Sequence, residues 1–172
     1  MSATAWGAVA GALAAAMVAR TGFRSAWDDE GPAGDIPVYF ATEAALIGDR
    51  VGTFLVIAFP GDPDVPSEGG QTGQVIATLP NPRTRQEDGV IRCLAVDQRG
   101  DIGDGVAPAS LAATLAVLDA VDAELRAAPT LGLTPTFSAL EARLGGLPSI
   151  RPMLGGGVTT WVEFDVVFSA RI

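Results

Sequence analysis

The C-terminal segment alternates apolar and polar residues, and this pattern constrains the fold more than any other feature of the chain. Six apolar residues stand at every second position from Val162 to Ile172. Most positions between them are polar, Glu163 and Asp165 among them. Successive side chains of a β-strand point to opposite faces. The pattern therefore predicts a strand over about 160–172, with one face in the core and the other facing outward.

Other apolar segments predict further strands. Residues 53–59 are apolar at nearly every position, which is typical of a strand covered on both faces. Pro37 restricts its own extended segment to a sheet edge or to the start of a strand. Cys93 lies in the middle of an apolar run, where a thiol is typically a small core side chain. Strands are also predicted over residues 36–41, 74–79 and 90–96.

A helix is predicted at the N-terminus, over about residues 4–20. Its larger apolar residues follow one another at spacings of three, four and four, as on one face of a helix. The first basic residue, Arg20, follows the apolar run instead of preceding it, unlike in a secretory signal. We therefore expect a packed helix and no membrane anchor. The residues of this face are Trp6, Val9, Leu13 and Met17.

A second, longer helix is predicted over about residues 108–127. Pro108 suits its first turn, and Pro129 follows its end. The expected buried face consists of Leu111, Leu115, Leu118 and Leu125 with Val121 beside them, and the expected outer face of Asp119, Asp122 and Glu124. A shorter helix is expected over Phe137–Leu144, ended by Gly145-Gly146, and a helical turn over Glu43–Ile47.

These elements predict one α+β domain over residues 1–172: a largely antiparallel sheet with the N-terminal helix and the long helix packed on one face. Two long polar loops interrupt it, residues 60–73 and residues 80–89. The first contains three prolines, four glycines and three acids, and so has no regular structure. Loops of this length in a compact domain often have a function.

The composition excludes several kinds of chemistry. The chain has no histidine, and all 11 of its basic residues are arginine. Serine–histidine and serine–lysine catalysis, zinc sites of the cysteine–histidine kind and lysine-containing phosphate loops are therefore excluded. A net charge of −9 with scattered arginines disfavours nucleic acids and anionic membranes as binding partners. We expect no bound metal and no cofactor.

The remaining candidate chemistry depends on acids. Glu163 and Asp165 point to the same side of the predicted last strand, which leaves a small enzyme acting through carboxylates as one alternative. Asp97, Asp101 and Asp104 lie in a glycine-rich stretch but lack the spacing of a calcium loop, so we interpret them as turn residues.

Four segments of the chain carry a family resemblance. They are a strand ending in a Gly-Asp-Pro turn (residues 54–63), a strand followed by Gly-Asp (91–101), a helix end (125–132), and a final strand closing on Ala-Arg-Ile (162–172). In order and spacing they resemble the tail terminator proteins of long-tailed bacteriophages and prophages of actinobacteria. The resemblance extends from about residue 4 to the C-terminus.

This resemblance implies a structural virion protein of the tail neck, assembled in the host cytoplasm and not an enzyme. It implies a homo-oligomeric ring, commonly of six subunits, on the head-proximal end of the tail tube. The ring stops polymerisation of the tube protein and joins the head–tail connector, and genome DNA passes through it. The alternatives are another neck or tail-completion subunit of this fold, the carboxylate enzyme, and an accessory binding module.

On this hypothesis, the two polar loops extend toward the tube or the neighbouring subunit. Their charged residues would make the contacts. These residues are Asp62, Asp64, Glu68, Arg83 and Arg85.

Deleting residues 64–71 tests this expectation. Because the segment is polar and rich in glycine and proline, its removal should leave the fold intact but abolish capping of tail tubes. Circular dichroism checks the fold, and electron microscopy of tubes grown with the variant checks capping. Unchanged capping by the deletion variant would refute a role for this loop.

Overall fold

The computed structural model describes residues 5–28, 31–40, 51–58, 74–78, 85–134, 136–154 and 157–171. Within them the chain forms two helices and seven strands. In chain order these are α1 (Ala5–Ala19), β1 (Phe23–Ser25), β2 (Ile36–Phe40), β3 (Gly52–Ile57), β4 (Gln74–Thr78), β5 (Arg85–Arg99), α3 (Val106–Ala127), β6 (Ala139–Leu154) and β7 (Val158–Arg171).

All seven strands belong to one sheet, in which six follow the order β1-β2-β3-β5-β7-β6. The seventh, β4, pairs with the N-terminal part of β5, on the same side of β5 as β3. The pairs β1–β2 and β2–β3 are parallel, and the other pairs are antiparallel. This confirms the predicted α+β fold with its largely antiparallel sheet. Pro37 was expected at a sheet edge or at the start of a strand. Because β2 lies between β1 and β3, it is not an edge strand, and Pro37 is its second residue, so the second alternative is correct.

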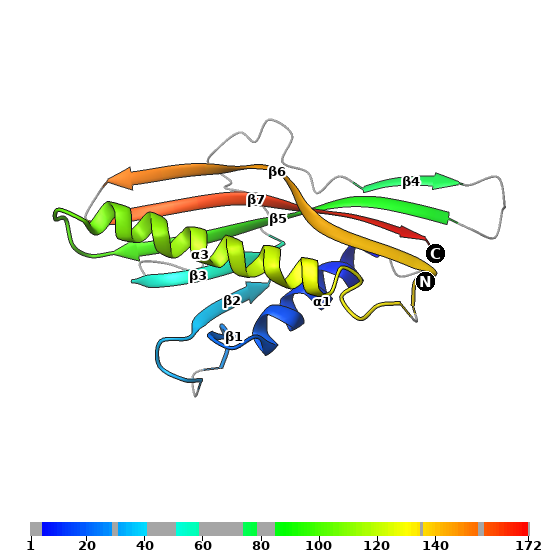
Figure 1. Ribbon diagram of the computed structural model, residues 1–172, viewed down its shortest axis with the longest axis horizontal. Coiled ribbons are helices and arrows are strands. Elements are labelled where there is room, and N and C mark those ends of the chain that lie inside the picture. The colour runs from blue at the N-terminus through cyan, green and yellow to red at the C-terminus, as the bar shows by residue number, and fades with distance from the viewer. Residues whose placement is uncertain are drawn as a thin grey trace.

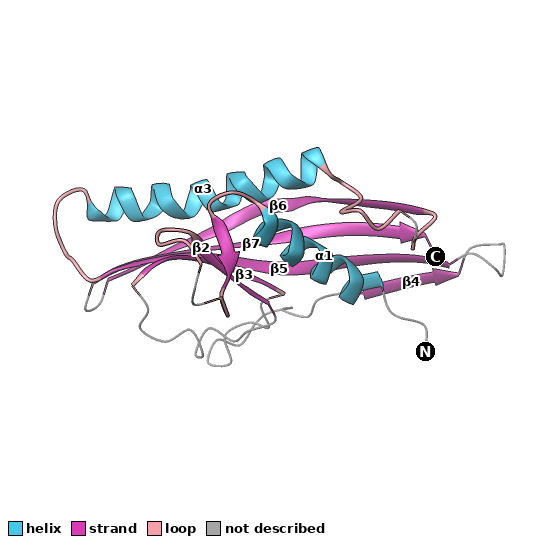
Figure 2. Ribbon diagram, turned by 90° about the horizontal axis from the view of Figure 1, so that it is seen from below, coloured by secondary structure: helices cyan, strands magenta, loops and turns pink. Residues whose placement is uncertain are grey.

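Both helices pack on the same face of a strongly twisted sheet. On the left of Figure 1, β6 is the uppermost strand and β2 lies lowest, whereas on the right β4 is uppermost and β6 lies lowest. The order is reversed because the sheet twists between the two sides. The long helix α3 packs along β5, β7 and β6, and the shorter α1 packs on β1, β2 and β5 (Figure 2). Arg20, just after α1, bridges to Glu124 of α3 at 3.2 Å and so ties the helices together.

The main core lies between the helices and this face. The alternation predicted for the last strand is confirmed, because every second residue from Val158 to Ala170 is buried. From α1 the core receives Val9, Leu13 and Met17, whereas Trp6 is only partly buried. In β3, Phe54 to Ile57 are all buried, so both faces of the strand are covered there, as predicted.

The long pairing of β5 with β7 contains one close approach. Gly89 lies opposite Phe168, and a Cβ atom at Gly89 would be 2.4 Å from the Phe168 ring. The aromatic ring thus occupies the space that a side chain at position 89 would need. A glycine at this position keeps the large Phe168 side chain flat against the sheet.

The expected helix over Phe137–Leu144 is wrong. Residues from Ala139 onward form β6, a long strand antiparallel to β7. Leu140, Ala142 and Leu144 alternate with charged residues, so the segment also fits a period of two, and pairing with β7 decides in favour of the strand. Gly145-Gly146 does not end a helix; the pairing register shifts between Gly145 and Ser149, and Gly146 has a φ of 55°.

The polar loop predicted over residues 80–89 is too long at its C-terminal end. Residues 85–89 belong to β5 and pair with β4. The strand predicted over 74–79 is present as β4. The loop 60–73, the rest of 80–89 and the helical turn over Glu43–Ile47 lie outside the described residues.

The buried face of α3 differs from the predicted one. Val121 and Leu125 are buried as expected, but Leu111, Leu115 and Leu118 are only partly buried. The helix is rotated so that hydroxyl-bearing residues meet the sheet near its N-terminus. The buried residues are Ser110, Thr114, Val117, Val121 and Leu125.

By length and hydropathy alone, α3 is also a helix that could cross a membrane, a test that core helices of globular proteins pass as well. In this fold α3 lies along the sheet, and its buried apolar side chains Val117, Val121 and Leu125 belong to the main core. Its outer side carries charge, including an ion pair between Asp122 and Arg126 at 2.7 Å.

A buried carboxylate attaches α1 to β5. Glu87 is fully buried, and its Oε1 accepts a hydrogen bond of 3.0 Å from the backbone N–H of Trp6 in the first turn of α1. The Trp6 indole donates to the carbonyl oxygen of Val90, also at 3.0 Å. A negative charge at a helix N-terminus is favourable because the N–H groups there have no partner within the helix. Residues 81 positions apart are thereby joined.

Replacing Glu87 by alanine should lower the free energy of unfolding by about 2 kcal/mol, because the change removes a buried acceptor and a helix cap. Urea denaturation followed by circular dichroism measures the effect. The matched control is Asp88→Ala, whose side chain is half-buried on the opposite face and should cost well under half as much. Equal stabilities for the two variants would contradict this role of Glu87.

Candidate functional site

Of the five predicted contact residues, the structure describes only the backbone of Arg85. Arg85 is the first residue of β5 and pairs with Thr78 of β4. It is therefore a strand residue and not part of a loop. Asp62, Asp64, Glu68 and Arg83 lie outside the described residues.

The sheet face opposite the helices contains a second, smaller apolar cluster near its β1–β2 side. Tyr39 and Phe54 meet edge to face, with ring centroids 6.0 Å apart, and Trp27 meets Tyr39 in the same way at 6.0 Å. Trp27 has 74% of its surface exposed. The cluster comprises Ala26, Tyr39, Phe54, Val56, Leu94 and Val96, with Trp161 packed against it.

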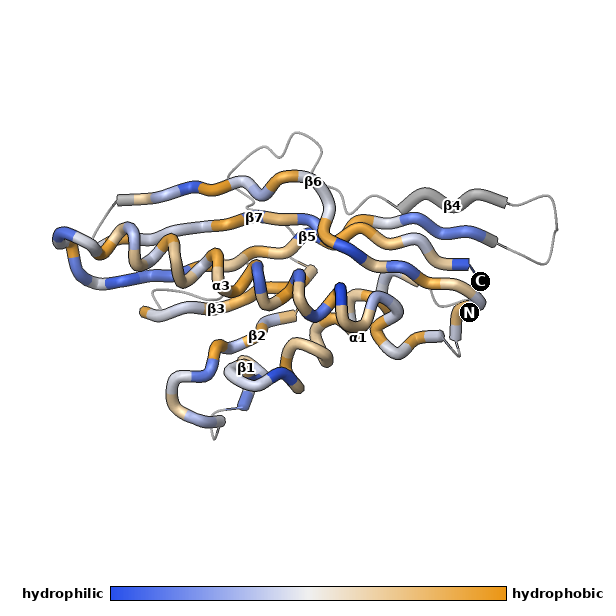
Figure 3. The backbone as a smooth tube through the Cα atoms, viewed as in Figure 1, coloured by the Kyte–Doolittle hydropathy of each residue, from blue (hydrophilic) through white to orange (hydrophobic). Residues whose placement is uncertain are grey.

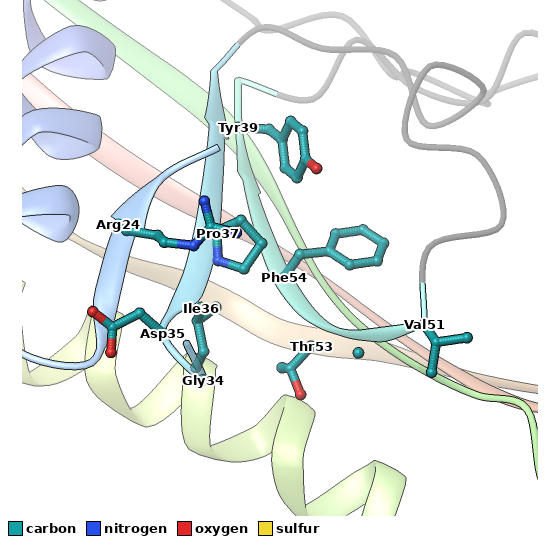
Figure 4. A pocket seen from close by; sticks show the side chains of 10 residues that line it. Arg24, Gly34, Asp35, Ile36, Pro37, Tyr39, Val51, Thr53 and Phe54 are labelled. Carbon is teal, nitrogen blue, oxygen red and sulfur yellow. The ribbon is translucent and has the colours of Figure 1, made fainter. Parts of the chain in front are cut away.

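An open hollow of about 550 Å³ adjoins these rings (Figure 4). The rings of Tyr39 and Phe54 line one part of it, and Arg24 and Asp35 line another. The Arg24 guanidinium donates hydrogen bonds to the carbonyl oxygens of Ser25 and Asp28, so it holds the chain that follows β1. The hollow therefore combines an aromatic wall with a cation already engaged in backbone contacts.

Farther along the same face the surface is charged. Arg92 of β5 lies opposite Asp165 of β7, with 3.9 Å between Nε and Oδ1. Arg151 of β6 lies 3.9 Å from Glu163. Glu163 and Asp165 therefore point to the same side of the last strand, as predicted, but each faces an arginine on a neighbouring strand. Figure 3 shows how the hydropathy changes along β5: the middle of the strand is hydrophobic and its ends are hydrophilic.

Asp97 has a structural position that the sequence reasoning missed. It was interpreted as a turn residue, but it is a buried residue of β5. Its carboxylate accepts hydrogen bonds from the Thr53 hydroxyl at 2.6 Å and from Arg99 Nε at 2.7 Å. Thr53 is 44 positions away in the sequence and meets Asp97 only because β3 pairs with β5. No local sequence pattern could therefore have revealed this cluster.

The same cluster continues to the start of α3. The Ser110 hydroxyl lies 3.1 Å from the Asp97 carbonyl oxygen and 2.9 Å from the hydroxyl of Thr160, which is opposite Asp97 on β7. These hydrogen bonds explain why the first turns of α3 present Ser110 and not Leu111 to the sheet. Burying Ser110 without such partners would be costly.

Cys93 lies in the main core, fully buried, as the sequence predicted. Burial among apolar side chains raises the pKa of its thiol to about 12. Its Sγ lies 3.8 Å from the carbonyl oxygen of Ile91. A thiol with this pKa is protonated at neutral pH and is a poor nucleophile.

Within the described ranges, no three His, Cys, Asp or Glu side chains are grouped as metal ligands. No protein-family model matches the chain, and no curated protein matches its sequence.

The Cys93 thiol should not react with a water-soluble disulfide reagent in the native state at pH 8. With a pKa of about 12, about one thiol in ten thousand is ionised at that pH, and the reagent must also reach the core. Absorbance of the released thiolate gives the rate, and urea should make the reaction complete. The control is the Cys93→Ala/Ser169→Cys double variant, whose thiol stands at an exposed position of β7. If the native wild type reacted as fast as this native variant, the burial of Cys93 would be contradicted.

Proposed function

We propose that this protein is a tail terminator of a long-tailed phage or prophage of actinobacteria. Copies of it form a ring, of six subunits on the family pattern, at the head-proximal end of the tail tube. The ring stops growth of the tube and presents a surface to the head–tail connector. The protein acts by binding and not by catalysis, and its place is the neck of the virion.

The observation that carries the proposal is where the four resembling segments lie in the fold. Residues 54–63, 91–101 and 162–172 include most of β3, β5 and β7, respectively. These three strands are consecutive neighbours in the sheet. Residues 125–132 begin with Leu125 of α3, which packs in the core on those strands. The described parts of these four segments thus lie together in one scaffold, which supports a resemblance between whole domains.

The charge of the chain is compatible with a ring through which DNA passes. The net charge of −9 repels a polyanion. Five arginines of the described residues, which would otherwise attract phosphates, pair with acids of the same chain. A duplex would therefore slide through without being held.

Mixing the purified protein with its tube subunit tests the proposal. Tubes grown alone should have a broad length distribution, whereas added protein should shorten them and place extra density at one end. Negative-stain electron microscopy measures both. An unrelated acidic protein of similar size is the control for nonspecific effects.

Unlimited tube growth with no density at the ends would overturn the proposal. Turnover of a substrate that is lost in a Glu163→Gln or Asp165→Asn variant, in a protein that stays monomeric, would favour the carboxylate enzyme instead.

A further inference from the structure

We draw no further inference here: the strongest candidate, the exposed apolar side chain of Leu147 on the edge strand β6, carries no proposal, because nothing among the described residues shows what covers it.

Discussion

The pairing of β5 with β7 is the interaction on which the rest of the structure depends. Fourteen consecutive residue pairs join Gln86–Arg99 to Val158–Arg171 in one unbroken antiparallel register. Strands β3 and β4 attach to the free side of β5, β6 attaches to the free side of β7, and both helices rest on the face that results. Because side chains alternate along a strand, this register determines which residues of both strands enter the core.

The two faces of the sheet differ in the residues they carry. One face carries both helices and the main core, and it is tied together by buried polar contacts such as those of Glu87 and Asp97. The other face carries the aromatic cluster around Tyr39 and, farther along, cross-strand ion pairs of partly exposed side chains. Such partly exposed ion pairs contribute little to stability. Among the described residues, Leu147 of the edge strand β6 is the most exposed large apolar side chain.

The sequence predicted some elements better than others for identifiable reasons. The last strand and α1 were predicted correctly because a strict period requires no knowledge of the partner. The segment that follows Phe137 was wrongly predicted as a helix. Phe137, Leu140 and Leu144 fit a helical spacing, while Leu140, Ala142 and Leu144 fit a strand, so local pattern could not separate the two. The candidate contact residues of the loops stay predictions. The exposure of Leu147 was not anticipated, because it depends on the irregular segment between Gly145 and Ser149.

By itself, the sequence determined the α+β class, the burial of Cys93, and the absence of histidine and lysine chemistry. These follow from periodicity and residue types, which are local properties. Only the tertiary structure decided which side of α3 faces the sheet, that Glu87 holds the N-terminus of α1, and that Asp97 is buried against Thr53 and Arg99. Each of these depends on atoms brought together from distant parts of the chain, and no short-range pattern encodes such a meeting.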